Sequence, residues 1–474
     1  MHFAQCPDLF HMWGTNSIQQ DHGRMVSLWF QSALLIEGWS NEVRITFDEN
    51  AIQSIETGAA PKPDDERYGI ALPGLANVHS HAFQRGMAGL AEVRGPAHDN
   101  FWTWREVMYR FLDRLDPNDI ESITALAYAE MLETGFTRVG EFHYLHHDPS
   151  GAPYANVAEL AERIASAANE TGISLTLLPV FYAHGNFGGR PPVPGQRRFL
   201  NDPPRFAKLV EQSRKAIASL PNANLGIAPH SLRAVTPKEM KEILPLADGG
   251  PIQIHAAEQT KEVDDCLEWS KQRPVEWLLN NAGVDEQWCL VHSTHMTADE
   301  TLHLAERGAV AGLCPITESN LGDGIFPASD YLAAKGRFGI GTDSNVMIDA
   351  AQELRTMEYA QRLNLRARNV LAPEAGRSTG RALFDGALAG GFQALGVANY
   401  GLTQGAPADI VTLDVNDPVF AGRSGDAILD SWLFARGTVD SVWKQGIKVV
   451  SRGRHHSRET ITRRYKETLS RILS

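Results

Sequence analysis

The strongest constraint on the fold is an alternation of short apolar runs and helical patterns between about residues 70 and 346. The intervening segments, such as YANVAELAERIASAANETG, have helical spacing and end in glycine, as helices commonly do. The strand-like runs are 75–80, 137–143, 173–182, 225–230, 251–255, 288–293, 309–315 and 338–342. An eightfold β-α alternation predicts a parallel (β/α)8 TIM barrel, with a doubly wound open sheet as the alternative. We favour the barrel because polar residues cluster after nearly every strand.

The two ends of the chain have a different pattern, with short strands and turns at 26–70 and 406–453. We expect these strands to form one small β-sandwich domain built from both termini, comprising residues 25–70 and 385–474 and flanking a barrel at 71–384. Residues 1–24 contain no lysine, one arginine and no continuous apolar run, which disfavours a signal peptide. We interpret them as an extension or an expression remnant without a function.

Composition excludes several classes of function. The 474 residues carry a formal charge of −13, which repels phosphate backbones and disfavours nucleic-acid binding. No apolar run approaches the roughly 20 residues needed to cross a bilayer. The four cysteines form no CxxC pair and no disulfide framework. We therefore expect a cytoplasmic protein with a small-molecule partner, no nucleic acid and no membrane, and a homodimer as the default assembly.

Histidines and a carboxylate follow the predicted strands at positions suited to a metal ion. His79 and His81 are two residues apart on one strand, so their side chains point to the same face. His255, His292 and Asp343 end the fifth, sixth and eighth strands, and all strand ends of a barrel face one mouth. Three imidazoles and a carboxylate suit zinc with one position open for water.

Two further observations define this site more closely. Glu258 lies three residues after His255, where its carboxyl group can reach the pocket and transfer protons without binding the metal. The fourth strand, in LGIAPHS, has no lysine at its end. Sites that bridge two metals through a modified lysine need one there, so we expect one zinc ion per chain.

Longer motifs around these residues resemble a known family. The arrangement of HxH, two later histidines and an aspartate resembles the amidohydrolase superfamily. More narrowly, LPGLANVHSHAFQRGMAGL, HAAEQ, CPITESNLGDG and EYAQRLNLRARN resemble the formimidoylglutamate deiminases of histidine degradation. The resemblance runs from about Ser27 to the C-terminal strands, and HSHAFQR and PITESNLGDG are its most specific segments.

The resemblance implies roles for individual residues. It implies that the zinc ligands are His79, His81, His255 and Asp343. It also implies that Glu258 and His292 move protons. We further expect His292 and Asp343 to orient the attacking water and help deprotonate it. One departure is Asn345, where the resemblance leads us to expect a histidine near the ligand set.

The substrate of such an enzyme, N-formimidoyl-L-glutamate, carries two carboxylates and therefore needs cations in the pocket. Arg105, expected in a long loop after the first strand, and Arg233, after the fourth, suit bidentate carboxylate recognition. Further hydrogen bonds can come from Tyr144 and His230, and Gln84 can hold the formimidoyl group. We interpret the FWTW segment beside Arg105 as loop packing.

The sequence therefore predicts a zinc-dependent hydrolase that converts N-formimidoyl-L-glutamate and water into N-formyl-L-glutamate and ammonia. One alternative is a nucleobase or other amidine deaminase of the same superfamily, whose pocket would not need paired arginines. A second alternative is a catalytically inactive scaffold, which the intact set of candidate ligands disfavours.

Overall fold

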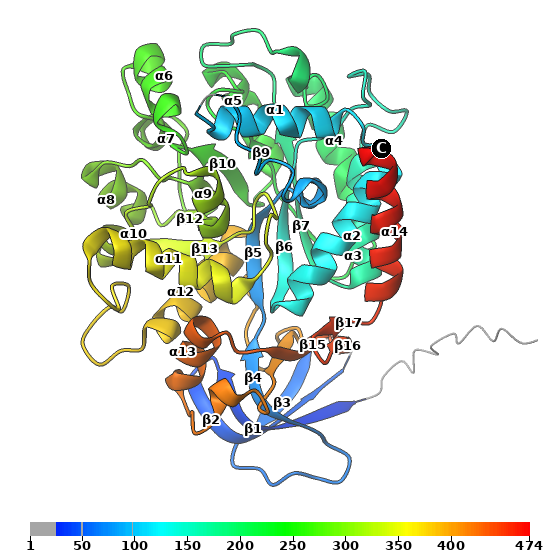
Figure 1. Cartoon of the computed structure of the whole chain (residues 1–474), viewed down its shortest axis with the longest axis vertical. Helices are drawn as coiled ribbons and strands as arrows, with labels where there is room; N and C mark the ends of the chain where they lie inside the picture. Colours follow the sequence, from blue (N-terminus) through cyan, green and yellow to red (C-terminus); the bar gives the residue numbers. More distant parts are fainter. Residues whose placement is uncertain (1–24, 49–50, 97) are drawn as a thin grey trace, which may run out of the picture.

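The computed structural model describes residues 25–474 apart from 49–50 and 97, and the extension at 1–24 lies outside the described residues. Figure 1 shows a barrel surrounded by helices, with a smaller sheet beneath it. No helix among the described residues is long and apolar enough to cross a bilayer.

The barrel is a parallel sheet in which neighbouring strands follow the order β10-β11-β12-β13-β5-β6-β7-β8, with β9 paired to β7. Bridges from Ile227 to Ile252 and from Ser231 to His255 join its two edges. Strands such as β7 are buried at every residue, as expected when helices cover a parallel sheet. The predicted barrel is confirmed, and its fourth strand is two short pieces. The strands are β5 (Leu75–Ser80), β6 (Phe136–His143), β7 (Ser174–Phe181), β8 (Asn224–Leu225), β9 (Ala228–Pro229), β10 (Ile252–Ala256), β11 (Trp288–His292), β12 (Val310–Leu313) and β13 (Arg337–Ile340).

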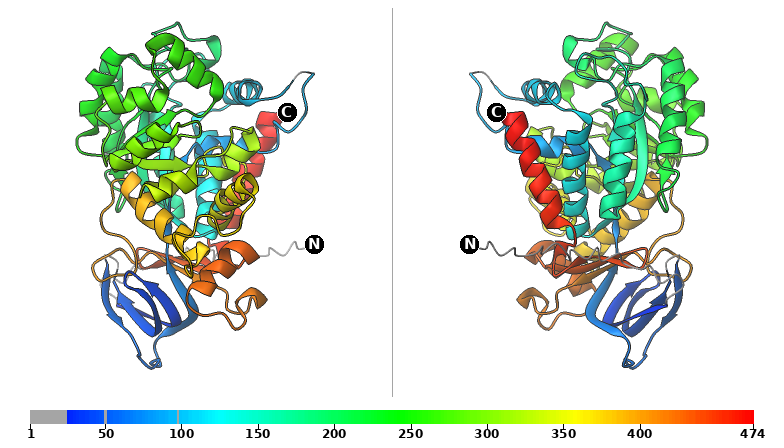
Figure 2. Two further views of the ribbon diagram at one scale, coloured as in Figure 1. Left: turned by 90° about the vertical axis from the view of Figure 1, so that its left-hand side faces the viewer. Right: turned by 90° about the vertical axis from the view of Figure 1, so that its right-hand side faces the viewer.

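Helices cover the outer face of the barrel and its mouth (Figure 2). Several begin with a proline after an Asp or Thr cap, as α5 does behind Thr236. The helices are α1 (Phe101–Leu112), α2 (Pro117–Glu133), α3 (Glu159–Thr171), α4 (Pro203–Ala216), α5 (Pro237–Ile243), α6 (Thr260–Ser270), α7 (Pro274–Asn281), α8 (Ala298–Glu306), α9 (Pro315–Leu321), α10 (Ala328–Ala333), α11 (Ala350–Leu365), α12 (Thr379–Ala394), α13 (Asp426–Ala435) and α14 (Arg458–Leu473).

One segment expected to be a loop is helix α1, so that expectation for the surroundings of Arg105 was wrong. The Asn100 side chain accepts hydrogen bonds from the backbone N–H groups of Trp102 and Thr103 and caps the helix. Buried Met108 and Phe111 follow at helical spacing and hold the helix against the barrel.

The small domain is one sheet in the order β17-β16-β15-β14-β4-β1-β2-β3, built from both ends of the chain. The sheet curls over itself, because the ring of Phe47 on β2 meets that of Trp443 on β15 at 5.7 Å although three strands separate them. This confirms the small sandwich-like domain. Its strands are β1 (Val26–Leu35), β2 (Gly38–Phe47), β3 (Ile52–Glu56), β4 (Glu66–Pro73), β14 (Ile410–Leu413), β15 (Val439–Lys444), β16 (Ile447–Ser451) and β17 (Arg454–His455).

The last helix leaves the small domain and lies beside the barrel. Figures 1 and 2 show α14 along α2, where Arg458 forms ion pairs of 2.9 Å with Glu130 and 2.8 Å with Glu133. The residues assigned to the small domain at the C-terminus thus include a helix that packs on the barrel. The boundaries at 70 and 385 stay a prediction.

Candidate metal centre and active site

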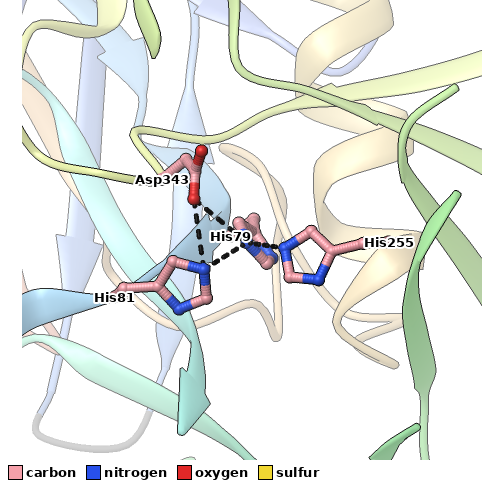
Figure 3. Close-up of side chains that lie close together, drawn as sticks. All are labelled: His79, His81, His255 and Asp343. Atoms are coloured by element: carbon pink, nitrogen blue, oxygen red, sulfur yellow. Dashed lines mark hydrogen bonds and ion pairs between the residues drawn. The ribbon is translucent and has the colours of Figure 1, made fainter. Parts of the chain in front are cut away.

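Four of the predicted site residues meet at the mouth of the barrel (Figure 3). His79 and His81 come from β5, His255 from β10, and Asp343 from the loop after β13. His79 Nε2 lies 3.2 Å from both His81 Nε2 and His255 Nε2. Asp343 Oδ1 lies 3.4 Å from His79 Nε2 and 3.2 Å from His81 Nε2. One ligand atom from each residue therefore falls within 4.8 Å of every other, in a fully buried group.

The opposite nitrogen of each imidazole is held by an oxygen of the protein. These pairs join His79 Nδ1 to Gln253 Oε1 at 3.2 Å, His81 Nδ1 to Phe142 O at 3.0 Å, and His255 Nδ1 to His230 O at 3.0 Å. Each Nδ1–H donates, so each Nε2 turns its lone pair toward the centre, as in zinc sites. Burial raises the pKa of Asp343, but the neighbouring imidazoles of His79 and His81 outweigh it and hold that pKa well below its usual range. The donor set fits a divalent metal ion.

Of these three oxygen partners of the imidazoles, only that of Gln253 belongs to a side chain, so its role can be tested by substitution. Its Nε2 donates to Val78 O at 2.7 Å, which turns Oε1 toward His79. We expect Gln253→Leu to weaken metal affinity by about 10–100-fold, the usual cost of losing such a partner. Competition with a chelator measures this loss. Gln361→Leu, at a buried glutamine that bonds Phe326 O elsewhere, is the control; equal affinities in the two variants would refute the role of Gln253.

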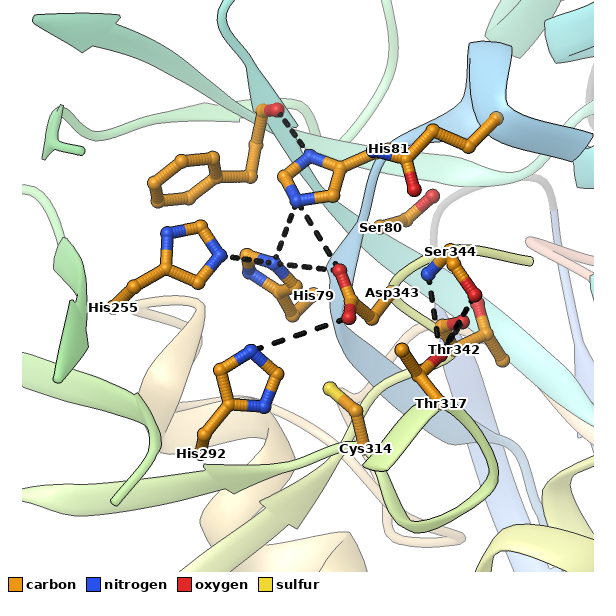
Figure 4. A network of polar contacts seen from close by, with 12 residues as sticks. His79, Ser80, His81, His255, His292, Cys314, Thr317, Thr342, Asp343 and Ser344 are labelled. Atoms are coloured by element: carbon orange, nitrogen blue, oxygen red, sulfur yellow. Dashed lines mark hydrogen bonds and ion pairs between the residues drawn. The ribbon is translucent and has the colours of Figure 1, made fainter. Parts of the chain in front are cut away.

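Glu258, His292 and Asp343 form a second polar group beside the centre (Figure 4 shows His292 and Asp343). His292 Nε2 lies 3.8 Å from Glu258 Oε1 and 4.0 Å from Asp343 Oδ2. Burial raises the pKa of Glu258 to about 7, against the opposing effects of His292 and Arg233. Burial alone would lower the pKa of His292, but Glu258, Glu318 and Asp343 together raise it to about 10. The group can therefore hold and exchange protons near neutral pH.

The backbone is strained where these side chains turn into the mouth. His292 has φ of 67° and Asp343 has φ of 42°, in the left-handed region that residues other than glycine rarely adopt. Ala257, one residue before Glu258, has φ of 52°. Such strain costs about 1–3 kcal/mol per residue and clusters at functional sites.

A cavity of about 260 Å³ opens in front of the centre. Arg105 and Arg233 both line it near Trp102, with guanidinium carbons 4.4 and 5.7 Å from the centroid of that indole ring. The Nε atoms of both arginines are buried without a hydrogen-bond partner among the described residues. The cavity in front of the metal centre therefore offers two cations with unused donors.

The remaining predicted residues line the same cavity. Gln84 Nε2 donates to Tyr144 Oη at 2.8 Å, and its Oε1 is buried with no partner within the described part of the chain. His230 contributes its ring to the cavity wall and its carbonyl to His255. The structure thus brings every predicted site residue to one place, while their roles stay predictions.

Several residues of the site were missed in the sequence. Glu318 on α9 accepts from His292 Nδ1 at 3.2 Å, and no strand-end pattern marks it. Gln253 precedes His255 by two residues on one strand, a signal of the same kind as HxH. Trp102 lines the cavity, so the interpretation of FWTW as packing was too narrow.

Asn345, the departure from the expected histidine, is a structural residue here. It bonds Ser80 Oγ and Asp343 O at 3.1 Å each, and its Oδ1 accepts from Thr342 Oγ1 at 2.6 Å. Its φ of 54° suits asparagine. These bonds hold the loop that carries Asp343.

Comparisons with known proteins agree with this geometry. Residues 70–449 match the model of the amidohydrolase family, and residues 26–69 match that of the N-terminal domain of formimidoylglutamate deiminase HutF. The chain is 49% identical to a formimidoylglutamate deiminase of Pseudomonas aeruginosa, over 95% of this chain and 100% of that protein. It is 28% identical to an 8-oxoguanine deaminase of the same organism, over 80% of this chain and 81% of that protein.

A solved structure agrees across the whole fold. An amidohydrolase from Brucella melitensis superposes with a TM-score of 0.92 at 54% sequence identity, covering 95% of this chain and 100% of the other. Family model, relative and structure thus agree on the family of this chain and on its fold. The chain belongs to the amidohydrolase family and, within it, groups with the formimidoylglutamate deiminases.

Proposed function

We propose that this protein hydrolyses the C=N bond of N-formimidoyl-L-glutamate, giving N-formyl-L-glutamate and ammonia, with one zinc ion per chain. The observation that carries this proposal is the pair of arginines with unused donors in the cavity that leads to the metal centre. An amidine that carries two carboxylates fits both ends of this cavity.

The zinc ion would be held by His79, His81, His255 and Asp343. When bound, such an ion supplies an activated water nucleophile at neutral pH. The distances among these four residues support the assignment, because their ligand atoms already converge on one point. Residues such as Gln253 hold the imidazoles ready and reduce the reorganisation that binding requires.

Protons are moved by the neighbouring group. The carboxyl of Glu258, with a pKa raised to about 7, delivers a proton to the terminal imino nitrogen, which makes the formimidoyl carbon more electrophilic. His292 and Asp343 orient the attacking water, and the Asp343 carboxylate accepts its proton at Oδ2, because the raised pKa of His292 keeps that imidazole protonated. Water then adds to the carbon, a second proton reaches the nitrogen, and the C–N bond breaks to release ammonia. The hydroxyl loses its proton as the formyl C=O forms.

The other end of the substrate is held by cations. Arg105 and Arg233 pair with the two carboxylates, since guanidinium groups match carboxylates in bidentate geometry. Tyr144 and His230 assist one carboxylate, and the free Oε1 of Gln84 accepts from the formimidoyl N–H. A nucleobase deaminase would have no use for two cations here, which favours the glutamate derivative.

The proposed reaction is tested by identifying its products. We expect incubation of zinc-loaded protein with N-formimidoyl-L-glutamate to give N-formyl-L-glutamate and ammonia in equal amounts, measured by mass spectrometry and a coupled ammonia assay. Formation of free glutamate and formamide would mean cleavage of the other C–N bond and would refute the proposed chemistry.

The metal content is a separate prediction. We expect elemental analysis of the purified protein to find one zinc per chain, and His255→Ala to lower the zinc content because it removes one of the four candidate ligands. His303→Ala, on the outer helix α8, is the control. Two tightly bound metals per chain would contradict the single site, and so would full zinc content in His255→Ala.

A further inference from the structure

The wall of the cavity near the arginines contains a tyrosine whose hydroxyl is held from behind. Tyr182 follows β7 and lines the cavity together with Arg105 and Arg233. Its ring lies 4.6 Å from that of His230 and 5.6 Å from that of Phe199, centroid to centroid, so the side chain is fixed on two sides. Tyr182 is not among the substrate-binding residues predicted from the sequence.

Gln196 forms a hydrogen bond with the Tyr182 hydroxyl. It lies in a short 3-10 helix, η2 (Pro194–Gln196), and its Nε2 donates to Tyr182 Oη at 2.7 Å. Its Oε1 accepts from the backbone N–H of Val193 at 2.8 Å, which fixes which end of the amide faces the tyrosine. Gln196 is 1% exposed, so this buried amide is locked in one orientation.

The fixed orientation of the Gln196 amide determines where the Tyr182 O–H points. Within the described part of the chain, the only hydrogen bond of the Tyr182 hydroxyl is the one that it accepts from Gln196. A phenol that accepts on one side keeps its own O–H as a donor. The cavity is where that donor finds an acceptor, because the Tyr182 side chain lines it.

The surrounding charge favours an anion at this point. Both guanidinium groups line the same cavity as Tyr182, and they are the charged groups that oppose the rise that burial causes in the pKa of Tyr182. Tyr109, under the Arg105 guanidinium at 5.6 Å from the ring centroid, lines the same part of the cavity. The cavity that would receive a carboxylate at these arginines is therefore also the cavity that the Tyr182 side chain lines.

We infer that Tyr182 donates a hydrogen bond to a substrate carboxylate held between Arg105 and Arg233, and that Gln196 is the positioning residue that aims this O–H. The inference rests on the proposed function, because it needs a substrate with a carboxylate at the arginine end. It makes Tyr182 a specificity determinant that selects carboxylated amidines over uncharged ones.

The test separates binding from chemistry. Hydrogen bonds to charged groups contribute about 1.5–3 kcal/mol, so we expect Tyr182→Phe to raise KM for N-formimidoyl-L-glutamate by roughly 10- to 100-fold with kcat changed by less than about 3-fold. Turnover of N-methylformamidine, which has no carboxylate, should not change. Tyr400→Phe, at a half-buried tyrosine stacked on Phe392 far from the cavity, is the matched control.

A double-mutant cycle tests the role of Gln196. We expect Gln196→Leu to raise KM in the same direction as Tyr182→Phe, and to add nothing in the Tyr182→Phe background, because its effect passes through the phenol. Zinc content and melting temperature report on folding of every variant. Multiplicative losses in the double variant, or equal losses on N-methylformamidine, would overturn the inference.

The outcomes also separate this inference from the proposed function. If wild-type protein turns over N-formimidoyl-L-glutamate and Arg233→Met does not, but Tyr182→Phe keeps the wild-type KM, only the present inference is wrong. If wild-type protein does not turn over that substrate, both are wrong.

Discussion

Arg233→Met should cripple the hydrolysis of N-formimidoyl-L-glutamate while leaving zinc content unchanged. Arg233 is 6% exposed and its Nη2 lies 3.8 Å from Glu258 Oε2, so a substrate carboxylate meets a desolvated cation there. Removing one partner of a buried charge pair costs roughly 2–5 kcal/mol, because the other charge stays buried and unpaired. At about 1.4 kcal/mol per tenfold, kcat/KM should fall roughly 30- to several-thousand-fold.

A second arginine variant serves as the control for Arg233→Met. Arg214→Met, at an exposed arginine 3.6 Å from Asp248 on the outside of the barrel, should leave kcat/KM unchanged. Equal losses by Arg233→Met on charged and uncharged amidines would show that Arg233 supports the structure around Glu258 and does not recognise a carboxylate.

Glu258→Gln should lower kcat by about 10²–10⁴-fold, with a much smaller effect on KM. The amide keeps the shape of the side chain but cannot deliver the proton that the imino nitrogen needs. Zinc content should remain at the wild-type level, because Glu258 lies outside the group of candidate ligands. Steady-state kinetics with elemental analysis of the same sample measures both.

A matched variant defines the background for this experiment. Glu268→Gln, on the outer helix α6, changes the same functional group far from the cavity and should leave kcat unchanged. Near-normal turnover in Glu258→Gln would move the proton transfer to His292 or Asp343.

The parts of this molecule that follow short-range rules could be predicted from the sequence. The eightfold alternation specifies the barrel, and a barrel brings all strand ends to one mouth, so His255, His292 and Asp343 could be assigned although 88 residues separate the first from the last. HxH needs only the two-residue period of a strand. Arg105 and Gln84 were assigned by resemblance to a family and not by spacing.

The residues that were missed depend on contacts with no local signature. Glu318 reaches His292 from a short helix, and Gln196 reaches Tyr182 from the loop after β7. Both are polar side chains in segments without strand or long-helix periodicity. The sequence of the α1 segment does not predict a helix clearly because its aromatic run hides the helical pattern, although Asn100 is a good capping residue.

We propose that this metal centre acts on an amidine that carries two carboxylates and not on a nucleobase. The most direct measurement is ammonia release by the zinc-loaded protein from N-formimidoyl-L-glutamate, guanine and 8-oxoguanine under identical conditions. We expect kcat/KM for N-formimidoyl-L-glutamate to exceed those for both purines by more than about 10³-fold, since neither purine can pair with the two arginines. Efficient deamination of either purine, with no ammonia from N-formimidoyl-L-glutamate, would contradict the claim.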